Sequence, residues 1–86
     1  MIKIWAKLIT DNKIVKQYIY EMDGTLLYSQ FLNYLIDICY ELDIPTPVIL
    51  KPHLFNYAKF NYTKFLKRDF VELFDYDSLI LENIFV

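Results

Sequence analysis

The sequence predicts an α+β domain in which a small, mostly antiparallel sheet packs on one main helix and a short second helix. Two segments near the N-terminus alternate apolar and polar residues, as strands do. The segment 27–42 instead repeats apolar residues at helical spacing. Two short segments in the C-terminal third are consistent with further strands. With 86 residues, the chain is predicted to form a single domain spanning residues 1–86.

The two N-terminal segments, residues 2–10 and 13–22, are predicted to form a β-hairpin. The dipeptide Asp11-Asn12 separates them. Asn tolerates the positive φ that tight hairpin turns require, so a two-residue loop is expected here.

A two-residue loop fixes the predicted register of the hairpin. Two lysines directly opposite each other are mildly destabilising, so a partner must neutralise Lys7 and Lys16 or the register must differ. The core face would pair Leu8 with Val15 and Ile4 with Ile19, and the outer face would pair Trp5 with Tyr18, Lys3 with Tyr20 and Lys7 with Lys16.

The main helix is predicted to follow Gly24, the only glycine of the chain, which favours a turn with positive φ. Thr25 is a candidate N-cap. The helix should end before Pro45, because the residue before a proline avoids the helical conformation. Its apolar stripe comprises Leu27, Phe31, Leu35, Ile38 and Leu42.

The second half contains the remaining predicted elements. Pro45 and Pro47 indicate an extended connection, and Pro52 is well placed to open a short helix ending near Phe60. A strand near residues 62–67, a turn near 67–69 and a final strand over 78–85 complete the fold.

Composition predicts an exposed apolar surface. Hydrophobic residues make up 56% of the chain and aromatic residues 19%. A domain of this size buries only roughly 60–65% of its unfolded surface. The remaining apolar surface is typical of interfaces, so a homodimer or a protein partner is expected.

No segment has the composition of a membrane span or a secretory signal, since Lys3 and Lys7 interrupt the N-terminal apolar residues. The single cysteine, Cys39, excludes an internal disulfide and lies beside the apolar stripe, where it is expected in the core. The prediction is a cytoplasmic protein without a membrane partner.

The segment 55–65 repeats the pattern Phe-Asn-Tyr-x-Lys, and Phe65 begins a third copy. A five-residue step suits neither a helix nor a strand, so the three phenylalanines are expected to anchor different parts of the fold. The alternative is an aromatic binding surface. The predicted interface residues are Trp5, Tyr18, Tyr20, Phe55, Tyr57, Phe60 and Tyr62.

Charge is strongly segregated along the chain. Residues 44–68 contain basic residues and no acid, and residues 69–86 contain acids and no base. One interpretation is single-stranded nucleic-acid binding by the basic, aromatic stretch 51–68. The outer face of the hairpin could help, since it would combine Trp5, Tyr18 and Tyr20 with Lys3, Lys7 and Lys16. The other is that the acidic segment neutralises the basic one, which fits a pI near 5.2 better. The candidate nucleic-acid contacts are Lys59, Lys64, Lys67 and Arg68.

His53, the only histidine, offers a third hypothesis: a small enzyme that uses it with a carboxylate such as Asp69 or Glu72. No spacing in the sequence places these groups together. The EF-hand pattern, a Cys/His cluster and a glycine-rich phosphate loop are all missing, so no metal or other cofactor is predicted.

The second half contains the His53 region, Phe60-Asn61-x-Thr63-x-Phe65, Asp69-Phe70-Val71-Glu72 and Asp77-x-Leu79. With these residues it resembles a group of short uncharacterised proteins from low-GC Gram-positive bacteria. The resemblance implies a bacterial, cytoplasmic accessory protein and brings no activity or ligand with it. It nominates His53, Asn61 and Asp69 as polar residues to test.

The leading hypothesis is a non-catalytic protein-interaction module that forms a homodimer or binds a protein partner. Its interface would be the outer face of the first hairpin or the aromatic segment 55–65. Nucleic-acid binding and catalysis by His53 remain the alternatives.

Overall fold

The computed structural model describes residues 1–84 and confirms the α+β prediction. The last predicted strand is present and ends at Asn83, whereas its predicted end at residue 85 lies outside the described residues. The elements are β1 (Ile2–Thr10), β2 (Lys13–Met22), α1 (Phe31–Leu42), α2 (Lys51–Phe60), β3 (Tyr62–Leu66) and β4 (Ser78–Asn83), with short 3-10 helices at Tyr28–Gln30 and Lys67–Asp69.

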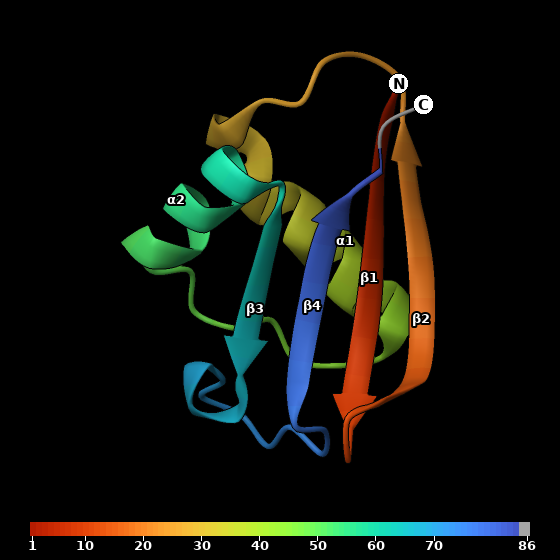
Figure 1. Ribbon diagram of the computed structural model, residues 1–86, viewed down its shortest axis with the longest axis vertical. Coiled ribbons are helices and arrows are strands. Elements are labelled where there is room, and N and C mark those ends of the chain that lie inside the picture. The colour runs from red at the N-terminus through yellow and green to blue at the C-terminus, as the bar shows by residue number, and fades with distance from the viewer. Residues whose placement is uncertain (85–86) are drawn as a thin grey trace.

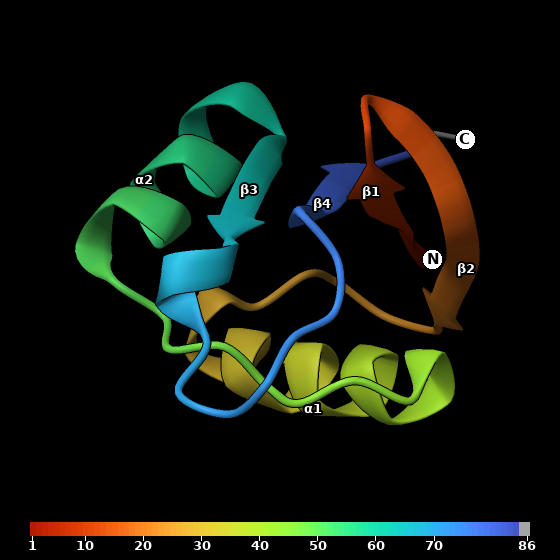
Figure 2. The same cartoon turned by 90° about the horizontal axis from the view of Figure 1, so that it is seen from below.

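The four strands form one sheet in the order β2-β1-β4-β3, and all neighbouring strands are antiparallel (Figure 1). Helix α1 lies against one face of this sheet, and α2 lies beside β3 at the sheet edge (Figure 2). In the described part of the chain no element covers the opposite face, which we call the outer face. No helix of residues 1–84 is long and apolar enough to cross a membrane.

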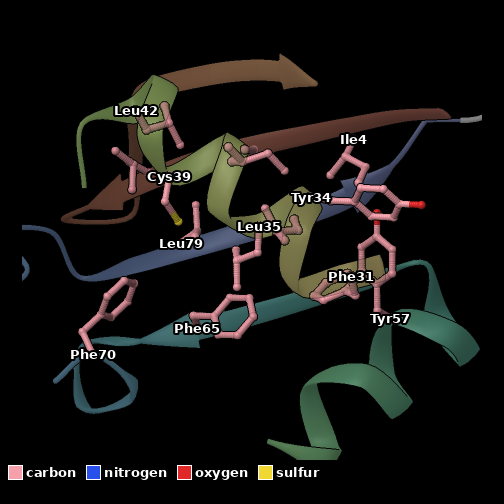
Figure 3. Packing of buried hydrophobic residues seen from close by; sticks show 14 of the residues in the cluster. Ile4, Phe31, Tyr34, Leu35, Cys39, Leu42, Tyr57, Phe65, Phe70 and Leu79 are labelled. Atoms are coloured by element: carbon pink, nitrogen blue, oxygen red, sulfur yellow. The ribbon is translucent and has the colours of Figure 1, made fainter. Parts of the chain in front are cut away.

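The core fills the space between α1 and the inner face of the sheet (Figure 3). Alternate residues of β1 point into it, as expected for a strand with one buried face. Cys39 is buried there, as predicted. The other strands and α2 contribute Phe65, Leu79, Leu81 and Tyr57, and β1 contributes Ile2, Ile4, Ala6 and Leu8.

The predicted start of α1 was wrong. A 3-10 turn precedes the helix, and its N-cap is Gln30 rather than Thr25. The backbone N–H of Leu27 donates to the hydroxyl of Tyr34 at 3.3 Å, which holds the chain before the helix in an extended conformation. Leu27 is therefore exposed, while the other four members of the predicted stripe are buried.

The C-terminal end of α1 is fixed before Pro45, as predicted. Asp43 adopts the left-handed conformation with φ of 56°, and the N–H of Ile44 donates to the carbonyl of Cys39 at 3.0 Å. The ammonium of Lys16 donates to the carbonyl of Leu42 at 2.9 Å. A cation at this position also complements the helix dipole.

The two-residue hairpin turn is confirmed, since Asp11 and Asn12 both have positive φ. The predicted register is wrong, however, because a β-bulge follows the turn. Ile9 pairs with Ile14 but Leu8 pairs with Lys16, which leaves Val15 as the extra residue on β2.

Beyond the bulge, each residue of β1 pairs with the β2 residue one position later than predicted. Lys7 therefore pairs with Gln17, and Ile4 pairs with Tyr20 rather than Ile19. Lys16 lies on the opposite side of the sheet from Lys7, so the predicted lysine pair does not form.

The second half follows the prediction closely. Pro52 lies in the first turn of α2, and Asn61, with φ of 58°, ends the helix in the left-handed conformation. The chain then enters β3 directly. A carboxylate oxygen of Asp69 accepts the N–H of Leu66 at 2.8 Å and so caps the 3-10 turn that follows β3.

Candidate interaction surfaces

The bulge divides the three hairpin aromatics predicted at the outer face. Trp5 lies there, but the placement of Tyr18 and Tyr20 was wrong, because both pack against the core on the inner side. The hydroxyl of Tyr20 donates to Asp37 of α1 at 3.3 Å. Burial, and then the negative charge of Asp37, raise the pKa of Tyr20. These two tyrosines therefore attach β2 to the helix layer.

The outer face joins parts of both predicted interface regions. Trp5 pairs with Ile19 on one side and with Glu82 on the other, and Glu82 pairs in turn with Tyr62. Directly opposite residues of antiparallel strands share one face. Trp5 of the hairpin and Tyr62 of the aromatic segment therefore lie in one row across the sheet.

The polar side chains in and beside this row contact one another. The ammonium of Lys7 lies 4.0 Å from the centroid of the Trp5 ring and 3.3 Å from the Glu82 carboxylate. The Lys7 side chain is only 12% exposed. The indole N–H of Trp5 donates to Gln17 at 2.9 Å. The lysine and the ring that a nucleic acid would use are thus already engaged.

The aromatic repeat is divided between solvent and core. Phe55 and Phe60 lie on α2 and are each 60% exposed, and the ammonium of Lys59 is 5.5 Å from both ring centroids. Tyr57 is fully buried, so its assignment to an interface was wrong. Only Phe65 acts as the predicted structural anchor, in the core beneath β3.

The candidate nucleic-acid contacts occupy three elements. Lys59 is on α2, Lys64 is on the outer side of β3, and Lys67 and Arg68 lie in the second 3-10 turn. Among residues 1–84 no ion pair joins them to a carboxylate. The acidic segment does fold back beside the basic stretch, since β4 pairs with β3 and Asp69 lies beside His53, although Glu82 pairs with Lys7 of the hairpin.

His53 and Asp69 are brought together by α2 and the second 3-10 turn. The Nε2 atom of His53 lies 3.4 Å from a carboxylate oxygen of Asp69, and both side chains are nearly buried. The Nδ1 atom accepts the backbone N–H of Leu50 at 2.9 Å. The imidazole also packs on the Phe65 ring, with centroids 4.3 Å apart.

This geometry gives His53 a structural role. Because Nδ1 accepts a hydrogen bond, its lone pair is occupied and the ring proton is assigned to Nε2, beside Asp69. A pocket of about 250 Å³ adjoins the pair. No lone pair of the ring is available to take a proton from a molecule bound in that pocket, as a general base requires.

Asn61 belongs to a polar network at the opposite end of α2. The hydroxyl of Tyr57 donates to the side chain of Asn83, whose amide donates to the side chain of Asn61 at 3.2 Å. The backbone N–H of Asn83 also donates to the carbonyl of Asn61 at 2.9 Å. Burial raises the pKa of Tyr57 well above its ordinary value. The network ties α2 to β4.

The most exposed apolar feature of α1 was missed by the sequence analysis. Leu32, Ile36 and Tyr40 are 52%, 45% and 83% exposed. Their four-residue spacing aligns them along one exposed side of α1. Figure 2 shows that α1 packs on the sheet with one side only. We call these three residues the α1 ridge. A second apolar stripe on a helix that already has a buried one is the signal that was available in the sequence.

A groove of about 410 Å³ adjoins the α1 ridge at Leu32. The connecting segment between the two helices forms its other wall, where Val48 is exposed. An apolar ridge beside an apolar groove is typical of surfaces that bind another polypeptide. The main lining residues are Phe31, Leu32, Pro47, Val48, Ile49 and Leu54.

Comparisons with known proteins find no relative of this chain, so the proposal of a function rests on its surfaces. No protein-family model matches the chain, and neither the curated proteins nor the solved structures include a match to it. Within residues 1–84, no group of three or more His, Cys, Asp or Glu side chains is arranged to hold a metal ion.

Proposed function

We propose that the chain is a non-catalytic protein-interaction module that binds a partner protein through the α1 ridge. The observation that carries the proposal is the exposure of Leu32, Ile36 and Tyr40 on a helix whose other apolar side forms the core. Contiguous exposed apolar surface is rare on monomeric proteins outside binding sites. The resemblance to short proteins of low-GC Gram-positive bacteria supports a bacterial cytoplasmic setting.

The alternatives have less support. Catalysis by His53 would require a free ring nitrogen, whereas one nitrogen accepts the Leu50 N–H and the other faces Asp69. Nucleic-acid stacking on Trp5 would compete with Lys7, which already lies over the ring. Within residues 1–84, the α1 ridge is exposed at all three of its residues.

The charges of α1 favour a basic partner over a second copy of the same helix. The helix contains Asp37 and Glu41 and no lysine or arginine, and the acidic Asp43 follows it. Two α1 helices packed on each other would bring these acids together, and like charges at an interface oppose association. The partner is therefore a different polypeptide whose apolar segment is flanked by lysine or arginine.

Native affinity purification from the source cells tests this proposal. The wild type and Phe55→Lys should retain a stoichiometric protein partner, and Ile36→Lys should lose it. Phe55 is an exposed apolar residue of α2, so Phe55→Lys makes the same kind of change outside the ridge. If all three proteins retain the same partner, or if Phe55→Lys also loses it, the ridge is not the binding surface.

A further inference from the structure

The pocket beside His53 and Asp69 lies between the start of α2, the strand β3 and the second 3-10 turn, which meet at one edge of the sheet (Figure 2). We call it the polar pocket. Its volume of about 250 Å³ is below the roughly 300–1,000 Å³ of pockets that enclose drug-sized ligands. A small ion or a single functional group therefore suits it better than a large ligand.

The walls of the polar pocket are joined through Asp69. Its carboxylate accepts the N–H of Leu66 at 2.8 Å and lies 3.4 Å from Nε2 of His53. Its backbone carbonyl accepts the N–H of Val48 at 2.8 Å. These contacts fix β3, α2 and the segment before α2 relative to the same turn. Such preorganisation lowers the cost of binding a ligand, because the lining does not have to be ordered first.

The remaining polar side chains of the lining are two cations and an amide. Lys64 comes from β3, Arg68 from the 3-10 turn and Asn56 from α2. Within residues 1–84, neither cation forms an ion pair, and no hydrogen bond uses any of these three side chains. The hydrogen-bonding capacity of all three is therefore available to a ligand.

The charge of the lining favours an anion. Two cations stand against one carboxylate, that of Asp69, which already accepts the Leu66 N–H. Arginine and lysine form strong, charge-assisted hydrogen bonds to phosphate. A phosphate group presents three acceptor oxygens, one for each of the three side chains, whereas a carboxylate presents two. Phosphate is therefore the better match.

We propose that the polar pocket binds a phosphate group through Lys64, Arg68 and Asn56. The group is that of free phosphate or of a small phosphate monoester. Lys59 and Lys67, the other two candidate nucleic-acid contacts, do not line the pocket. The basic stretch thus provides a site for one phosphate rather than a track for a strand. This site is separate from the α1 ridge and does not depend on the function proposed for it.

Titration of the ¹⁵N-labelled full-length chain with inorganic phosphate, at constant ionic strength, tests the site by amide NMR shifts. The amides around the polar pocket should shift and saturate with a Kd of roughly 1 mM. Arg68→Gln and Lys64→Gln should each weaken binding at least about tenfold, because each removes a charge-assisted hydrogen bond. Both residues are exposed, so the variants should fold, and the same spectra verify this. Lys67→Gln removes a charge from the same turn outside the pocket and should change the Kd by less than about twofold.

Three results would overturn the proposal. The first is a titration that does not saturate by about 20 mM phosphate, roughly twenty times the expected Kd. The second is an equal loss of affinity in Lys67→Gln and Arg68→Gln, which would indicate attraction to the basic surface in general. The third is acetate binding as tightly as phosphate. O-phosphoserine distinguishes the two sources of the group: tighter binding than inorganic phosphate would support a monoester as the ligand, and weaker binding would support the free ion.

Discussion

The ammonium of Lys7 lies 4.0 Å from the centroid of the Trp5 ring, and the same nitrogen is 3.3 Å from the carboxylate of Glu82. The outer face has the aromatic and basic residues of a nucleic-acid-binding surface, but Lys7 and Trp5 already contact each other and Glu82 neutralises the lysine. The aromatic ring, the cation and the anion come from β1 and β4, which are far apart in sequence. The sequence alone therefore overstates the availability of Trp5 and Lys7.

We expect Trp5 and Lys7 of the outer face to contribute nothing to the binding of a mixed-sequence single-stranded oligonucleotide, so the wild type and Trp5→Ala should behave alike. Phosphate binding would have to displace Glu82 from Lys7, and base stacking would have to displace Lys7 from Trp5. Fluorescence anisotropy in about 50 mM salt checks this, since low salt favours phosphate contacts. Binding that weakens at least about tenfold as salt rises to about 200 mM would restore the nucleic-acid hypothesis.

His53→Phe should lower the free energy of unfolding by about 1–3 kcal/mol, because the N–H of Leu50 loses its acceptor in a partly buried position. Phenylalanine keeps a ring against Phe65, so the loss reports mainly the polar contacts of His53. Urea denaturation measures the change, and Lys51→Ala is the exposed control in the same helix. A His53→Phe protein as stable as the wild type would contradict the structural role.

Thr63→Val should raise the free energy of unfolding by about 1 kcal/mol. Within residues 1–84, the buried hydroxyl of Thr63 has no hydrogen-bond partner, and burying an unpaired polar group is unfavourable. Valine has a similar shape and suits a strand. The matched control is Thr25→Val, where the residue is exposed and little change is expected. Destabilisation of Thr63→Val alone would show that the Thr63 hydroxyl has a partner.

Cys39 should resist thiol reagents at pH 8 in the folded protein and react on unfolding. Burial raises the pKa of its thiol from about 9 to about 12, so the reactive thiolate is suppressed. Since the folded-state pKa is the higher one, the associated stability is fully present below about pH 9 and is lost as the pH rises towards 12.

Two measurements check Cys39. Labelling with a chromogenic disulfide reagent at pH 8 should be slow without denaturant, and the urea midpoint should fall between pH 9 and pH 12. The fall should be smaller in Cys39→Ala. Rapid labelling of the folded wild type would mean that the thiol is accessible. Burial also raises the pKa of Tyr57, so part of the alkaline loss should persist in the variant.

The elements of the fold were predictable because each has a local signal. Pro52 opens α2, Asn61 ends it, and the Asp11-Asn12 turn joins the first two strands. The start of α1 was not predictable in this way, because a contact from Leu27 to Tyr34 keeps Thr25 outside the helix. A side-chain contact seven residues along the chain thus overrides the local capping preference.

The wrong register predicted for the hairpin explains why Tyr18 and Tyr20 were placed on the wrong face of the sheet. A single extra residue, Val15, moves Tyr18 and Tyr20 from the outer face to the inner face. The period of a strand is two residues, so a slip of one exchanges the faces. The pairing of His53 with Asp69 could not be predicted either, because it depends on how α2 returns to the turn after β3.

The α1 ridge, in contrast, could have been predicted from the sequence. Leu32, Ile36 and Tyr40 follow the same spacing as the buried stripe, and they were overlooked because one stripe already accounted for the helix. In a small domain, apolar helix residues outside the buried stripe therefore indicate a candidate binding surface.

Site-specific photo-crosslinking tests the role of the α1 ridge most directly. Tyr40→p-benzoylphenylalanine places the photoreactive group on the ridge, and Tyr62→p-benzoylphenylalanine places it on the outer face as a matched control. In the source cells, the Tyr40 variant should give one covalent adduct with a partner protein, and that adduct should vanish when Ile36→Lys is added. No adduct at Tyr40, or an adduct only at Tyr62, would contradict the proposal that α1 binds the partner.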